Sequence, residues 1–307
     1  MLSRHTSFEP ALRPHSGRRR IGALAIQAAA LTIVLLIHGR CPGAEGGAGV
    51  SVTRLVAAGT TLDLYLPPSR PAPLVVLSHG FARMAAHHSG TARHLAERGF
   101  AVAVPEVTRP PVLATLVQEL ARRSAEPGDP LAGRFEARRI GLAGHSAGGA
   151  ASIEAAVLLQ ETTTPASAIC LLDAVPHRST LRAAGRLRPV HVASLRAEPS
   201  PCNARGSTAA LLARLPFSVE DVIVTGATHC DQENPSDRLC ALACGAADPE
   251  RQAVFRDLAT RFLEDALLPE RRGAGGYRAE IARLEARGTV RRLGSSDPSR
   301  FNPNGAP

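Results

Sequence analysis

Short apolar runs alternate with amphipathic segments along the middle of the chain, from residue 73 to residue 267. The apolar runs are nearly continuous, as in strands covered on both faces, and the segments between them show helical spacing of apolar positions. This alternation predicts an α/β domain with a mostly parallel sheet and helices on both faces. The expected strands are residues 74–78, 100–104, 140–143, 168–172, 190–195 and 222–225, and the expected helices are residues 91–98, 111–123, 150–160 and 250–267.

The regions beside this alternation set the domain limits. Residues 50–56 and 61–65 have the character of two short strands joined by a turn, and they predict an antiparallel edge. We therefore place the domain at residues 45–269, and its short connections leave no room for a large lid domain. Residues 270–307 are rich in Arg and Gly, which predicts a mobile tail with one short helix at residues 277–287.

Residues 1–44 predict export of the chain. Three arginines, Arg18 to Arg20, precede an apolar run over residues 21–37. The run is longer than the ~7–15 residues of a signal-peptide core and shorter than the ~18 of a transmembrane helix, so a cleaved signal and an N-terminal membrane anchor both stay open. In either case the basic flank stays inside, so the domain is expected to be secreted, periplasmic or anchored to the outer face of the cytoplasmic membrane.

The charge of the chain argues against a nucleic-acid partner. The 307 residues carry a formal net charge of +9, but the excess lies at the ends. Residues 1–40 hold six Arg against one Glu, a net of +5, and residues 270–307 hold eight Arg against four acidic residues, a net of +4. The middle of the chain is neutral, so the domain lacks the basic surface that a polyanion requires.

Six cysteines fit an oxidising compartment. Cys170 lies in an apolar run and is expected to be a buried free thiol. An even set within one 43-residue segment predicts two disulfides, whose three possible pairings the sequence leaves open. The members of this set are Cys202, Cys230, Cys240 and Cys244. A metal site that combines His229 with cysteines of this set is the rival, but the spacing matches no common structural zinc site, and we expect no metal.

The run Gly144-His145-Ser146-Ala147-Gly148 matches the pattern G-x-S-x-G between an expected strand and an expected helix. A sharp strand-to-helix turn needs small residues around the serine, because the backbone is strained and neighbouring elements approach closely. Such a turn exposes the hydroxyl at the positive end of a helix, where developing negative charge is stabilised. Without a dinucleotide-binding or P-loop pattern beside it, the motif predicts Ser146 as a nucleophile.

A second turn lies upstream, where the expected strand at residues 74–78 runs into His79-Gly80-Phe81. Acyl hydrolysis needs two N–H donors for the oxyanion, one from the residue after the nucleophile and one from the loop after this earlier strand. The backbone N–H groups of Ala147 and Phe81 are therefore the expected pair.

The expected base is His229, which follows the strand at residues 222–225 late in the chain. Two carboxylates, Asp173 and Glu198, follow other expected strands at their carboxyl ends, where sites of α/β folds collect. Either could orient the histidine, so the acid stays open at this point.

The His79-Gly80-Phe81 turn, the Gly144–Gly148 motif and the order Ser, Asp, His resemble the α/β-hydrolase superfamily over residues 50–267. His87-His88, the strand at residues 100–104 and Leu172-Asp173-Ala174 are similar to the branch that contains platelet-activating-factor acetylhydrolases, chlorophyllases and dienelactone-hydrolase-like polyester hydrolases. This resemblance implies an α/β-hydrolase fold, favours Asp173 over Glu198 as the acid, and implies that His145 points away from the chemistry.

The resulting expectation is a serine hydrolase that cleaves carboxylic esters through Ser146, Asp173 and His229 and an acyl-enzyme. The expected substrate is a small-molecule, lipid or polyester ester. Tryptophan is absent and aromatic residues make up 3% of the chain, which favours small or aliphatic acyl groups. No cofactor is implied. An amidase or peptidase with the same triad and a non-catalytic binding protein on the same fold are the alternatives, and the oligomeric state stays open.

Overall fold

The structure is a computed structural model that describes residues 49–271 and 276–293. The expected export segment at residues 1–44 and the chain after residue 293 lie outside the described residues. Within the described part, no helix is both long and apolar enough to span a membrane.

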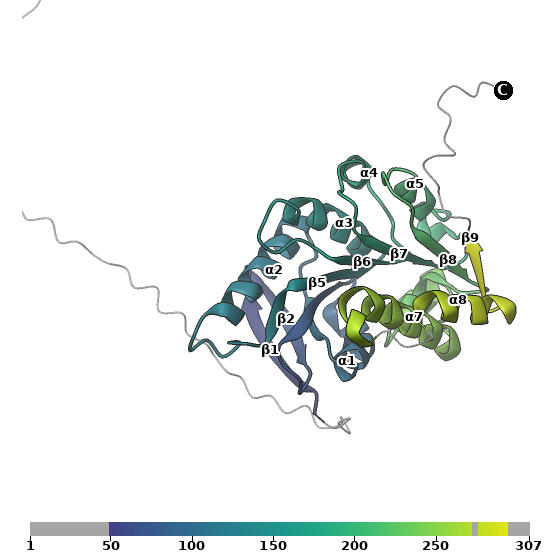
Figure 1. Cartoon of the computed structure of the whole chain (residues 1–307). Helices are drawn as coiled ribbons and strands as arrows, with labels where there is room; N and C mark the ends of the chain where they lie inside the picture. Colours follow the sequence, from purple (N-terminus) through teal and green to yellow (C-terminus); the bar gives the residue numbers. More distant parts are fainter. Residues whose placement is uncertain (1–48, 272–275, 294–307) are drawn as a thin grey trace, which may run out of the picture. The chain divides into compact units, whose positions relative to one another are not determined.

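The described residues form an α/β fold with a nine-stranded, mostly parallel sheet (Figure 1). The strands are β1 (Ser51–Ala57), β2 (Thr60–Leu66), β3 (Ala72–Ser78), β4 (Ala101–Pro105), β5 (Phe135–His145), β6 (Ala168–Leu172), β7 (His191–Arg196), β8 (Glu220–Val224) and β9 (Val290–Leu293). The helices are α1 (Ser89–Glu97), α2 (Pro110–Ala125), α3 (Ala147–Leu159), α4 (Arg178–Ala184), α5 (Thr208–Leu212), α6 (Arg238–Cys244), α7 (Pro249–Leu267) and α8 (Tyr277–Ala286). Short 3-10 turns are η1 (Ala85–His88), η2 (Pro201–Asn203), η3 (His229–Gln232) and η4 (Pro269–Arg271).

The strand order is β1-β2-β4-β3-β5-β6-β7-β8-β9. Neighbouring strands from β4 to β8 are parallel, and β1, β2 and β9 are antiparallel to their neighbours. The chain passes from β3 to β4 on one side and then returns to β5 on the other, which makes a switch point at the carboxyl ends of β3 and β5. Ligand sites of open α/β sheets collect at such a point.

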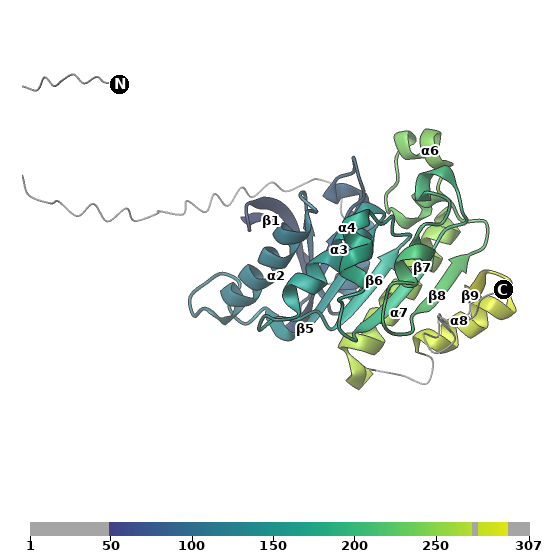
Figure 2. The ribbon, with the colours of Figure 1, turned by 90° about the horizontal axis from the view of Figure 1, so that it is seen from above.

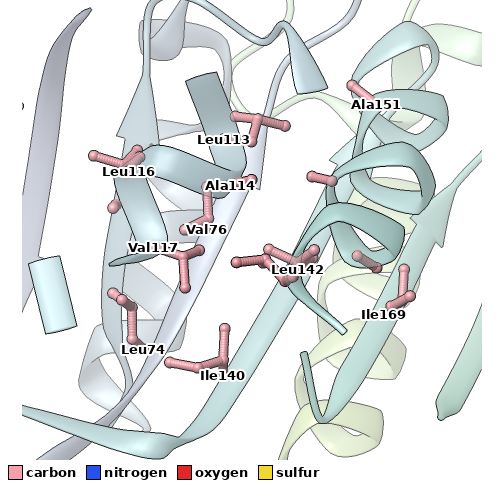
Figure 3. Close-up of a cluster of buried hydrophobic side chains, with 14 of the residues drawn as sticks. Leu74, Val76, Leu113, Ala114, Leu116, Val117, Ile140, Leu142, Ala151 and Ile169 are labelled. Atoms are coloured by element: carbon pink, nitrogen blue, oxygen red, sulfur yellow. The ribbon is translucent and has the colours of Figure 1, made fainter. Parts of the chain in front are cut away.

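Alternate residues of the central strands belong to two separate cores, as expected for a sheet covered on both faces. Leu74 and Val76 of β3 pack with α2 and α3 (Figure 3), whereas Val75 and Leu77 pack in the core that includes α1 and α7. Their strand therefore has no polar face, which explains its continuous apolar sequence. The two helix layers hold the parallel strands rigid and fix the loops at their carboxyl ends.

The C-terminal boundary differs from the sequence prediction. The short helix expected near residue 277 is present as α8, but the chain after Pro269 also supplies β9, which pairs with β8. Val290 is buried, whereas the two arginines that follow it are not. A single buried residue in an arginine-rich segment gives no alternating pattern, so this edge strand was not predicted. The domain extends to at least residue 293.

Candidate functional site

Ser146 occupies a strained turn between β5 and α3. Its φ is 56° and its ψ is −122°, which is a conformation that non-glycine residues rarely adopt. The turn is held on both sides, because the Ser146 N–H donates to the Leu172 carbonyl (3.0 Å) and the Val175 N–H donates to the Ser146 carbonyl (3.1 Å). These bonds fix the serine between the ends of β5 and β6, and its side chain stays partly exposed.

The glycines of the motif are required by close backbone contacts. A Cβ at Gly148 would lie 2.4 Å from the carbonyl oxygens of Ser78 and His79, and a Cβ at Gly144 would lie 2.4 Å from the carbonyl carbon of Gly148. Only residues without side chains fit there. The turn at Ser146 is thereby pressed against the end of β3, as the sequence pattern predicts.

The upstream turn lies directly beside the serine. A Cβ built on Gly80 would be 3.0 Å from the Ser146 Cβ. Phe81 follows Gly80, and Ala147 is the first residue of α3, where backbone N–H groups have no partner within the helix. Ala147 therefore adjoins the serine in sequence, and Phe81 follows a residue that lies against the serine across the switch point.

His229 and Asp173 form a buried pair. The distance between His229 Nδ1 and Asp173 Oδ2 is 2.6 Å, and Asp173 has no exposed surface. A carboxylate only accepts hydrogen bonds, so Nδ1 donates the proton of this bond, and in the neutral imidazole Nε2 is then the nitrogen with the free lone pair. Asp173 itself is fixed at the end of β6, because its N–H donates to the Leu195 carbonyl at 2.8 Å.

The structure brings Asp173, and not Glu198, to His229. The Glu198 side chain is partly exposed and pairs with Arg291, with 3.4 Å between Glu198 Oε2 and Arg291 Nη2. Both carboxylates follow neighbouring strands of the sheet, so only the path of the loop that carries His229 distinguishes them.

Asn203 is a further residue of this site, and sequence reasoning missed it. It is fully buried, and its Nδ2 donates to Asp173 Oδ2 (3.1 Å) and to the Glu198 carbonyl (2.9 Å). Its Oδ1 accepts from the N–H groups of Ser200 and Gly206. Asn203 thus connects Asp173 to the backbone of residues 198–206. Its position next to Cys202 is the one signal in the sequence that could have drawn attention to it.

His145 lies against His229, which corrects the expectation that it points away. The two ring centroids are 4.3 Å apart, and the His145 side chain is 2% exposed. Burial, followed by the nearby His229, lowers the pKa of His145 well below its ordinary value of 6.5. The residue before Ser146 therefore packs against the His229 ring.

Two disulfides connect the loops of the site to α6. Cys202 pairs with Cys244, and Cys230 pairs with Cys240, which selects one of the three possible pairings. Cys202 precedes Asn203, Cys230 follows His229, and both partners lie on α6, at one end of the strands (Figure 2). One short helix therefore anchors both loops.

Cys170 is a buried free thiol, as predicted, and burial raises its pKa to about 12. The sulfurs of Cys230, Cys240 and Cys244 lie within 4.8 Å of one another, as ligands of a metal would. Each of these three sulfurs belongs to a disulfide, however, and a disulfide sulfur is not the thiolate that binds metals.

A cavity of about 720 Å³ lies elsewhere, between the starts of β7 and β8, the end of α7, and α8. None of Ser146, Asp173 and His229 lines it. The candidate site lies instead at the carboxyl ends of the strands, where Ser146 is partly exposed and the His229–Asp173 pair is buried.

Comparison with known proteins found no matching family model and no matching curated protein. A functional assignment for the chain therefore depends on the chemistry of the residues around Ser146.

Proposed function

We propose that the chain is an exported serine hydrolase with an α/β-hydrolase fold that cleaves carboxylic esters. The proposal depends on two features that lie next to each other at the carboxyl ends of the strands. Ser146 lies in a strained turn at the start of a helix, and the buried His229–Asp173 pair packs against the residue before it. Strain, burial of ionisable groups and an oriented imidazole cluster at catalytic sites.

In the proposed reaction, Nε2 of His229 accepts the proton of the Ser146 hydroxyl as Oγ attacks the ester carbonyl. Asp173 stabilises the resulting imidazolium and holds the ring in the required tautomer. The backbone N–H groups of Ala147 and Phe81 stabilise the oxyanion. The alcohol leaves with the proton from His229, and water, activated by the same base, then releases the acid from the acyl-enzyme.

The loop that follows Gly80 exposes apolar residues beside the serine. The Phe81 side chain is 86% exposed and that of Met84 is 56% exposed, so the loop beside Ser146 presents apolar surface to a substrate. Both residues follow the Gly80 turn. An ester with a short apolar acyl chain can contact this loop without a deep pocket, and a lipid or an aliphatic polyester offers the same chemistry.

Export is part of the proposal and is supported by the two disulfides. Disulfides persist in oxidising compartments, and both of those found here hold loops of the site. If catalysis requires these two disulfides, the protein is active outside the cytoplasm.

The proposal is tested with the full chain, expressed in an oxidising compartment, on p-nitrophenyl esters from acetate to long acyl chains. The wild type is expected to be active, with a preference for short or medium chains, and Ser146→Ala is expected to lower kcat/KM by at least about a thousandfold. Equal activity of both proteins would contradict the assignment of Ser146. A wild type that fails on esters but cleaves amides would move the assignment to the amidase alternative.

A further inference from the structure

Two segments that are far apart in sequence run side by side at the site. One is residues 79–90, which follow β3, and the other is residues 233–237, which follow η3. The Asn234 N–H donates to the His87 carbonyl (2.8 Å), and the Gly90 N–H donates to the Asn234 carbonyl (2.8 Å). A Cβ at Gly90 would lie 2.4 Å from Asn234 Oδ1, so the contact is close.

Arg83 is the centre of this contact. Its Nε and Nη2 each lie 2.6 Å from an oxygen of Glu233, and Nη2 is also 3.0 Å from Asp237 Oδ1. The Arg83 side chain is 10% exposed and that of Glu233 has no exposed surface. A two-pronged pair of this kind fixes orientation as well as distance, because the guanidinium and the carboxylate are both planar.

Each partner belongs to a turn that carries a proposed catalytic group. The Arg83 N–H donates to the Gly80 carbonyl (3.3 Å) and so closes the turn that presents the Phe81 N–H. The Glu233 N–H donates to the Cys230 carbonyl (3.1 Å), in the same turn as His229.

A second connection runs through α6. Asp237 precedes α6 and accepts from the Cys240 N–H at 2.9 Å, and Cys240 is joined to Cys230. The hydrogen bond from Cys240, followed by the one from Arg83, lowers the pKa of Asp237, so it remains a carboxylate. His87 Nε2 also lies 3.0 Å from Asp237 Oδ2.

We propose that Arg83 is a positioning residue, which acts through Glu233 and Asp237 to hold the Gly80–Phe81 turn at a fixed distance from His229. The inference rests on the proposed function, since it assigns a purpose to the spacing between the oxyanion donor and the base. Oxyanion donors act over about 2.7–3.1 Å, and a misplacement of about 1 Å can cost a hundredfold in rate. Arg83 touches neither the substrate carbonyl nor the proton that is transferred.

The test compares Arg83→Lys, Arg83→Met and the double variant Arg83→Met/Glu233→Leu in the full chain. Lysine keeps the charge but not the two-pronged pair. The double variant removes both charges, so it avoids a buried unpaired carboxylate that could prevent folding. Arg123→Met is the matched control, because Arg123 pairs with Asp129 (3.0 Å) at a similar low exposure on the surface of α2, away from the site.

The first readout is kcat and KM on a p-nitrophenyl ester, with reactive serines counted by labelling to completion with a fluorophosphonate. We expect the double variant to lose about 10- to 100-fold in kcat per labelled serine with KM within about threefold, Arg83→Lys to lose less, and the control to match the wild type. A folded double variant with wild-type kcat would overturn the proposal.

The second readout is amide hydrogen exchange of residues 79–90, followed by mass spectrometry. Exchange is expected to rise in the double variant and to stay unchanged in the control. Unchanged exchange in the double variant would overturn the proposal even if no ester is cleaved. An inert wild type would contradict the proposed function alone, so the two failures are distinguishable.

Discussion

The imidazole of His145 lies against the imidazole of His229, with ring centroids 4.3 Å apart. Beyond His145 lies a third ring, that of His88, at 6.0 Å. The ring nitrogens of His88 have no hydrogen-bond partner among the described residues, and Nδ1 of His145 lies 3.8 Å from Oε1 of Glu233. Burial, followed by nearby basic groups, lowers the pKa of His88 to about 3, and burial lowers that of His145 well below 6.5. Both rings therefore stay neutral beside the proposed base.

Neutral burial of these rings predicts a loss of stability in acid. Below pH 6.5 the unfolded chain binds protons on His88 and His145, whereas the folded chain does not bind one at His88 until about pH 3. Each such histidine lowers the free energy of unfolding by up to about 1.4 kcal/mol per pH unit over that window. Urea unfolding at several pH values between 7.5 and 4 measures the slope. His88→Leu should reduce it and the exposed His191→Gln should not, and an equal slope in wild type and His88→Leu would contradict the neutral state of His88.

The choice between the two carboxylates gives a second prediction. Asp173→Asn is expected to lower kcat by about 10⁴-fold, because an amide beside Nδ1 no longer holds the histidine in the right tautomer. Glu198→Gln should stay within about threefold of the wild type, since Glu198 faces Arg291. Steady-state kinetics on one ester measures both. The reverse ranking would make Glu198 the acid.

The glycines around the serine give a third prediction. Gly148→Ala would place a Cβ 2.4 Å from two backbone oxygens that have no room to move, so we expect a loss of several kcal/mol or failure to fold. Gly185→Ala is the matched control, because the nearest atom to its Cβ would be 3.8 Å away and its φ is −67°. Thermal unfolding should show the control to be neutral or slightly more stable. Equal melting temperatures for the two variants would contradict the packing described for Gly148.

The disulfides give a fourth prediction. Loop entropy suggests that removing Cys230–Cys240, which are 10 residues apart, costs about 2.7 kcal/mol, and that removing Cys202–Cys244, which are 42 residues apart, costs about 4 kcal/mol. Activity should follow a different order. Cys230→Ser/Cys240→Ser should lower kcat in folded protein at least as much as Cys202→Ser/Cys244→Ser, because Cys230 adjoins His229. Denaturant unfolding measures the loss of stability, and steady-state kinetics measures kcat. An unaffected kcat in both variants would show that α6 does not position the site.

The sequence predicted the parallel strands and the long helices because continuous apolar runs and helical spacing are local features. Helix α6 escaped prediction for a physical reason. It has seven residues, its Leu239 and Leu242 are exposed, and disulfides rather than an apolar face hold it. A seven-residue segment of this kind carries no periodic pattern to detect.

In the candidate site, too, local sequence features could be predicted and contacts between distant segments could not. Ser146 could be located because a tight turn demands glycines at fixed offsets, and that demand is visible in the sequence. The partner of His229 could not be derived from the residues alone, because Asp173 and Glu198 follow adjacent strands and only the path of η3 selects between them. Arg83 and the orientation of His145 depend on contacts between distant loops, for which a single sequence has no signal. For Asn203 the only signal is the adjacent Cys202.

The most direct test of the central claim is mass spectrometry of the chain after reaction with a fluorophosphonate. We predict one covalent adduct, on the peptide that contains Ser146, with loss of esterase activity in proportion to labelling, and no adduct in Ser146→Ala. The adduct should form much more slowly in His229→Ala, because that variant lacks the base. An adduct on another residue, or esterase activity that survives complete modification of Ser146, would contradict the account.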